Sequence, residues 1–96
     1  MKSKIFSTHD RDAHAFMQPF CAPHAGVAIR GFTDAILKPV QPSDISNHPD
    51  SFDLYELGEF DADSGIITPL ERPQMILMGK SVVAQEPPQE PINRNK

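Results

Sequence analysis

The spacing of apolar and polar residues predicts one helix packed on an antiparallel sheet. Over residues 25–37 apolar residues recur at the spacing of a single helical face, namely Ala25, Ala28, Ile29, Phe32, Ala35 and Ile36. Pro23 precedes this segment and Pro39 follows it, which indicates a helix with defined ends. Gly26 and Gly31 weaken the helix by roughly 1 kcal/mol each relative to alanine. Such a helix needs a sheet to cover its apolar face.

Two pairs of strand-like segments flank the predicted helix. Residues 3–8 and 15–21 predict a hairpin, in which Pro19 favours an edge position or a bulge. Residues 52–60 and 66–70 predict a second hairpin, which turns through the sequence DADSG. The expected order is β-β-α-β-β, a small α+β domain.

Prolines and polar residues indicate where regular structure should stop. Residues 39–51 predict a loop, because they contain three prolines among Ser, Asp and Asn residues. We expect the core domain to span residues 1–72 and an extended, peripheral segment to span residues 73–84. Residues 85–96 are rich in Pro and offer almost nothing to bury, so we expect a disordered tail.

Charge is unevenly distributed, although the net charge of −4 is modest. No Lys or Arg lies between Lys38 and Arg72, whereas eight acidic residues do. Any direct phosphate contact should therefore come from the basic flanks of the chain. The alternative is ordinary solvated charge.

The sequence indicates a soluble, intracellular protein. Its single cysteine, Cys21, permits no intrachain disulfide, which favours a reducing compartment. The N-terminal residues lack the apolar stretch of a signal peptide. No segment approaches the roughly 18 apolar residues that a membrane span requires, and we expect no membrane association.

The turn DADSG begins like a calcium-binding loop. An EF-hand loop places its glycine at position 6 and a bidentate glutamate at position 12. Counted from Asp61, Gly65 falls at position 5 and Glu71 at position 11, each one residue early. A side-chain-capped turn between two strands explains the same residues, and we favour it.

Zinc and catalytic sites have weaker support. Four potential zinc ligands occur within sixteen residues, namely His9, His14, Cys21 and His24, but the two histidines that come first are too far apart for a usual ligand pair. Cys21 and His24 with Asp10 or Asp12 would form a catalytic triad, yet nothing in the spacing requires one. We expect no metal, no cofactor, no catalytic residues and no enzyme activity.

The aromatic residues Phe6, Phe16, Phe20 and Tyr55 have two interpretations. They could form a stacking platform for single-stranded nucleic acid, with basic residues beside it. They could instead fill the core between sheet and helix, and we favour this because a domain of this size needs most of its aromatic residues for its core.

Several short motifs follow one another over residues 2–70. K-x-F-S-x-x-D begins at Lys4, QPF at Gln18, A-I-R-x-F-x-D at Ala28 and HP-x-x-F-x-L-Y-x-L-G-x-F-D at His48, and a Ser-Gly turn follows. In this order they resemble the small non-structural protein of gokushovirus-type microviruses, which are single-stranded DNA phages.

The resemblance implies a protein absent from the mature virion, the counterpart of the microvirus C protein. Such a protein would engage the viral replication complex in the host bacterial cytoplasm and commit new single strands to packaging in the procapsid. The implied mechanism is that of an adaptor, with one face for the replication machinery and another for DNA or procapsid proteins.

Candidate contact residues follow from this expected role. For DNA they are Lys2, Lys4 and Arg11 on the first hairpin and Arg30 on the helix; for a basic protein partner they are Glu56 and Glu59. The alternative is a protein-interaction module that binds capsid or host proteins without touching DNA. That module would act through an exposed strand edge or as a homo-oligomer.

Overall fold

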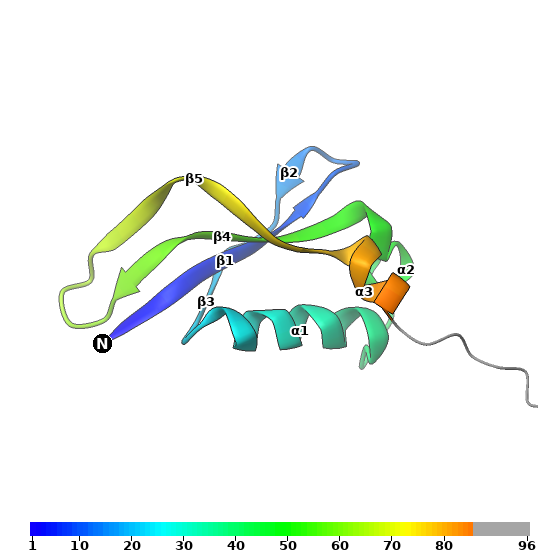
Figure 1. Ribbon diagram of the computed structural model, residues 1–96, viewed down its shortest axis with the longest axis horizontal. Helices are drawn as coiled ribbons and strands as arrows, with labels where there is room; N and C mark the ends of the chain where they lie inside the picture. Colours follow the sequence, from blue (N-terminus) through cyan, green and yellow to red (C-terminus); the bar gives the residue numbers. More distant parts are fainter. Residues whose placement is uncertain (86–96) are drawn as a thin grey trace, which may run out of the picture.

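The computed structural model of the protein describes residues 1–85 and shows a twisted antiparallel sheet with a helix along one face (Figure 1). Its elements are the strands β1 (Lys2–Asp10), β2 (Ala15–Phe16), β3 (Phe20–Ala22), β4 (Phe52–Asp61) and β5 (Ile67–Met78), and the helices α1 (Ala25–Leu37), α2 (Asp44–Asn47), the 3-10 helix η1 (Pro49–Ser51) and α3 (Gly79–Gln85). The strand order is β2-β1-β4-β5, and β3 also pairs with β1. The predicted α+β fold, one main helix on an antiparallel sheet, is confirmed.

The first predicted hairpin exists, but its second strand is divided in two. β1 pairs antiparallel with both β2 and β3, with His9 opposite Phe16 and Phe6 opposite Phe20. Between β2 and β3 the chain leaves the ladder, and the Ser7 hydroxyl donates to the Met17 carbonyl at 2.7 Å. Proline has no N–H to offer a ladder, so the expected irregularity at Pro19 becomes this break.

Helix α1 has the predicted bounds, and its apolar face supplies three of the eight buried core residues. Ala28, Phe32 and Ile36 are buried at intervals of four residues. They join a cluster completed by Phe6, Ala22, Phe52, Leu54 and Val82. The helix ends at Leu37, and the Lys38 N–H donates to the Asp34 carbonyl at 2.8 Å.

The prediction of a loop over residues 39–51 holds for residues 39–43 but is wrong for most of the remainder, because α2 and η1 lie there. Ser43 and Ser46 form a capping box at the start of α2: each backbone N–H donates to the other residue's hydroxyl, at 2.8 and 3.2 Å. Pro49 occupies the start of η1, where a missing N–H costs nothing. Pro39 and Pro42 lie between α1 and the N-cap of α2, and Pro49 begins η1, so none of the three prolines interrupts a helix.

The packed part of the chain extends beyond residue 72, where we expected the core to end. β5 continues to Met78, and α3 places Val82 in the core with 4% of its surface exposed. Pro69 and Pro73 are tolerated in β5 because it is an edge strand of the sheet. Apart from Gln85, which ends α3, the predicted disordered tail 85–96 lies outside the described residues.

None of the helices within residues 1–85 is long and apolar enough to cross a membrane.

Candidate functional site

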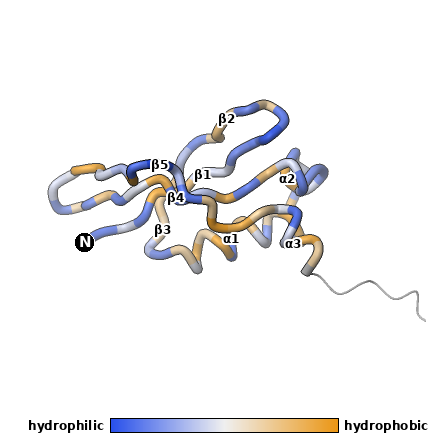
Figure 2. The backbone as a smooth tube through the Cα atoms, turned by 45° about the horizontal axis from the view of Figure 1, so that its top comes forward, coloured by the Kyte–Doolittle hydropathy of each residue, from blue (hydrophilic) through white to orange (hydrophobic). Residues whose placement is uncertain are grey.

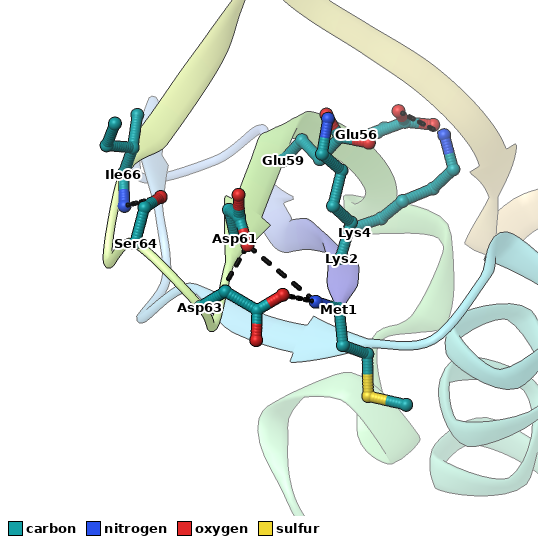
Figure 3. Close-up of polar contacts among 9 residues, drawn as sticks. All are labelled: Met1, Lys2, Lys4, Glu56, Glu59, Asp61, Asp63, Ser64 and Ile66. Carbon is teal, nitrogen blue, oxygen red and sulfur yellow. Dashed lines mark hydrogen bonds and ion pairs between the residues drawn. The ribbon is translucent and has the colours of Figure 1, made fainter.

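The lysines predicted to contact DNA pair with the glutamates predicted to contact a protein partner. Lys4 Nζ lies 3.3 Å from Glu56 Oε2, and Lys2 Nζ lies 3.8 Å from Glu59 Oε1 (Figure 3). The pairs form because β1 and β4 are antiparallel neighbours. The residues directly opposite are Glu59 for Lys4 and Asp61 for Lys2, so each lysine reaches its glutamate diagonally across the two strands. The Glu56 side chain is only 14% exposed. These four residues therefore neutralise one another within the sheet.

Arg11 is also engaged by the protein itself. Its Nε lies 3.1 Å from Asp53 Oδ2, and its Nη2 donates to the Asp50 carbonyl. The Asp53 side chain is 4% exposed, and its Oδ1 has no hydrogen-bond partner among residues 1–85. The backbone N–H of Arg11 donates to the Ser51 carbonyl at 2.8 Å. Arg11 thus joins the turn after β1 to η1 and supplies the positive charge facing a buried carboxylate.

Arg30 differs from the other basic candidates. It is exposed on α1 and belongs to no ion pair within residues 1–85. Its neighbours on the exposed side of the helix include Val27, which is 45% exposed, and Gly31. Of the four basic candidates, Arg30 is therefore the one that the described structure leaves available for a phosphate.

The DADSG segment is a side-chain-capped turn. The Asp63 N–H donates to Asp61 Oδ1 at 3.0 Å, and the Ile66 N–H donates to the Ser64 hydroxyl at 3.2 Å. Gly65 has a φ of 78°, which glycine adopts without strain. The Asp61 and Asp63 carboxylates both point toward the backbone nitrogen of Met1 (Figure 3).

The candidate metal and triad residues are spread over several elements. His9, on β1, packs against the rings of Phe16 on β2 and Tyr55 on β4. Cys21 is exposed on β3, and His24 occupies the N-cap position of α1. His14 lies in the turn after β1 with a φ of 56°. Within residues 1–85 no three His, Cys, Asp or Glu side chains gather in a metal-binding group.

The aromatic residues predicted to form the core divide between core and surface. Phe6 is fully buried, as expected, and Phe32 and Phe52 join it. Phe16 and Phe20 are 43% and 41% exposed, so the prediction is wrong for them. For Phe16 the reason is the break between β2 and β3, because β2 projects from the side of the sheet opposite α1 (Figure 1) and takes Phe16 with it. Phe20, on β3, stays stacked on Phe6 with ring centroids 5.9 Å apart.

Phe16 is part of an aromatic cluster with His9 and Tyr55. The centroid of its ring lies 4.7 Å from that of His9 and 5.2 Å from that of Tyr55, and both contacts are edge-on. Met75 lies directly opposite Tyr55 on β5 and is 47% exposed, and Met17 is 46% exposed. Sequence analysis missed His9 as a member, because its proximity to Tyr55 depends on the register of β1 against β4.

A second apolar surface lies at the end of the molecule where β1 begins and β4 ends. Two adjoining hollows of about 340 and 280 Å³ share Cys21 and Phe60 on their walls. We call them together the end groove. Met1 and Ala62 border the first hollow, and apolar side chains of β1, β3 and β5 border the second, namely Ile5, Phe20 and Ile67.

Comparisons with known proteins place this fold in a family. The family model described as "Phage ORF5 protein" matches residues 3–82, which span every element from β1 into α3. None of the curated proteins compared with the chain matches it, and no solved structure does. Since the family model covers most of the chain, this protein belongs to the phage ORF5 protein family.

Proposed function

We propose that this phage protein is a non-enzymatic adaptor in single-stranded DNA replication or genome packaging, and that it recognises its partners mainly through protein contacts. The family match supports a phage protein. The order of motifs over residues 2–70 supports the narrower assignment to gokushovirus-type microviruses and to a counterpart of their C protein. The partners would then be the replication complex and procapsid proteins in the host cytoplasm.

One observation carries the preference for protein contacts. Three of the four predicted DNA-contact residues, Lys2, Lys4 and Arg11, pair with carboxylates of β4, while large apolar side chains remain exposed. A phosphate backbone is bound chiefly by available Lys and Arg side chains. Protein interfaces are instead centred on aromatic residues and Met. The available surface therefore has the chemistry of a protein interface.

The aromatic cluster is the surface best suited to a different protein. It lies beside the end of β1 and the turn that follows, because Asp10 pairs with Ala15 next to the pair of His9 and Phe16. Asp10 and Asp12 belong to no ion pair within residues 1–85, although the Asp10 carboxylate accepts from two backbone N–H groups of the turn and the Asp12 carboxylate accepts from the Ser51 hydroxyl. Aromatic faces and nearby carboxylates both favour a cationic side chain. The partner at this surface would be a basic protein segment. We had expected Glu56 and Glu59 to bind such a segment.

Capture from infected cells, with and without nuclease, tests this function. The partner should stay bound after nuclease treatment and be lost with Phe16→Ser. Val40→Ser, at a side chain that is 99% exposed in the loop after α1, is the matched control and should retain the partner. Release by nuclease alone would mean that DNA, and not protein, forms the link.

Direct contact with single-stranded DNA is a second candidate, favoured by the available guanidinium of Arg30. It predicts salt-sensitive binding that Arg30→Ala weakens and that falls steeply with ionic strength. Fluorescence anisotropy with a labelled oligonucleotide at low salt measures this. Absence of binding by the purified protein would remove direct DNA contact from its role. Lys4→Ala should affect DNA binding less than Arg30→Ala, because Lys4 is already paired with Glu56.

A further inference from the structure

The end groove is an apolar surface that the proposed function does not use. Phe60 and Cys21 line both of its hollows, and the walls are almost entirely apolar. Lys2 carries the one charged side chain on the described lining and is paired with Glu59 at 3.8 Å, and the amine of Met1 is paired with Asp61 and Asp63. The start of β5, at the same end of the molecule, is also apolar (Figure 2), and Ile67 is 61% exposed there. An apolar patch of this kind, rimmed by polar residues, is typical of a protein interface.

The edges of the sheet are poor places for a partner to add a strand. β5 forms one edge and contains Pro69 and Pro73, and Pro19 interrupts the segment that carries β2 and β3 at the other. Each proline removes an N–H donor from the edge. A partner is therefore expected to pack on side chains of the end groove. Binding through an exposed strand edge stays the alternative prediction.

We propose that the end groove is the interface between two copies of this chain in a two-fold dimer. A two-fold interface uses the same patch on both subunits, so the patch must be complementary to itself. The end groove meets this requirement: it has a hollow beside Cys21 and Phe60, and it has exposed apolar side chains, Phe20 and Ile67, on its border. Phe20 and Ile67 of one copy would fill the hollow of the other.

Electrostatics favours a second copy at the end groove. A chain with a net charge of −4 repels its own copy, so a self-interface should form where charge is neutralised. The ion pair between Lys2 and Glu59 achieves this next to the end groove. At the aromatic cluster, Asp10 and Asp12 would instead face the same carboxylates of a second copy. The two surfaces therefore suit different partners.

The size of the core supports the same conclusion. Within residues 1–85, eight hydrophobic residues are buried and eleven large ones are exposed. Small domains with thin cores often gain stability by oligomerisation. Packing two end grooves together would bury several of the exposed side chains at once.

The test compares two adjacent isoleucines of nearly equal exposure. Ile67 lines the end groove and is 61% exposed, whereas Ile66 is 60% exposed and borders a different, more polar hollow with Lys2 and Glu59. Sedimentation equilibrium of the purified full chain should give twice the monomer mass of 10.7 kDa. Ile67→Asp should raise the dimer dissociation constant at least about tenfold, and Ile66→Asp should leave it within about twofold.

The single cysteine provides a second readout, which can be followed in the wild-type protein as well as in a variant. Cys21 lines both hollows, so its alkylation by iodoacetamide should slow as protein concentration rises through the dimer dissociation constant. In Ile67→Asp the rate should no longer depend on concentration, and circular dichroism should show the native spectrum. A monomer at all concentrations up to about 200 μM, or a dimer that both isoleucine variants weaken equally, would overturn the proposal. Because phage partners are absent, this result is independent of the adaptor function.

Discussion

Gly58 lies where β4 and β5 approach each other too closely for a side chain. It pairs with Pro69 on β5 and with Ile5 on β1, next to register shifts in both ladders. A Cβ atom at this position would lie 2.6 Å from the Thr68 carbonyl oxygen and 2.8 Å from Pro69 Cα. Both are backbone atoms, so no side-chain rotation can relieve the overlap. We predict that Gly58→Ala destabilises the protein.

The expected magnitude follows from two opposing terms. Inserting a methyl group into well-packed structure typically costs about 1–3 kcal/mol through displaced backbone. Replacing glycine by alanine also restricts the unfolded chain, which stabilises the native state by roughly 0.5–1 kcal/mol. The central values of the two terms, about 2 and about 0.7 kcal/mol, leave a net loss of about 1.3 kcal/mol. In a domain of about 100 residues this lowers the midpoint of thermal unfolding by roughly 5–10 °C.

Gly31 provides the matched control. It lies on the exposed side of α1, and a Cβ atom there would meet no heavy atom within 4 Å. The added methyl group causes no overlap, so only the higher helix propensity of alanine affects stability. Gly31→Ala should therefore stabilise the protein by about 1 kcal/mol. Thermal and urea unfolding followed by circular dichroism measure both variants. If Gly58→Ala were as stable as the wild type while Gly31→Ala gained stability, the close approach of β4 and β5 would be refuted.

Two further substitutions test contacts that join separate elements. Arg11→Ala should destabilise the protein by about 1–3 kcal/mol in urea unfolding, because it leaves the buried Asp53 carboxylate without its positive partner; equal stability of variant and wild type would mean that water replaces Arg11 without cost. Ser43→Ala should lose about 1 kcal/mol by removing the capping box of α2, whereas Ser43→Asn should lose less; similar losses in both variants would argue against the capping role.

The parts of the fold that the sequence predicted are those that depend on local information. The bounds of α1 follow from apolar spacing within thirteen residues and from the flanking prolines. The irregularity at Pro19 follows from its missing N–H. The capping box of α2 is also local, but its N3 position is Ser46 in place of the usual Glu or Gln. The sequence pattern therefore did not predict this helix start.

The candidate site could be predicted only in part, because its contacts join distant segments. Lys4 and Glu56 were both selected for their charge, but they are 52 positions apart. Their pairing depends on the register of β1 against β4, which includes a shift between Ile5 and Phe6. The exposure of Phe16 likewise depends on how β2 leaves the sheet. Neither feature is visible in a single sequence.

The uneven charge of the chain has a structural explanation once the register is known. The basic first strand and the acidic fourth strand are neighbours, so their charges are complementary within the protein. Charge used in this way contributes little to the attraction of phosphate. Two surfaces of different chemistry remain available for recognition. The end groove is apolar and suits a second copy of the chain. The aromatic cluster lies beside Asp10 and Asp12 and suits a basic partner. A dimer would present two aromatic clusters at once, and linked sites of this kind gain affinity by effective concentration without any new contact.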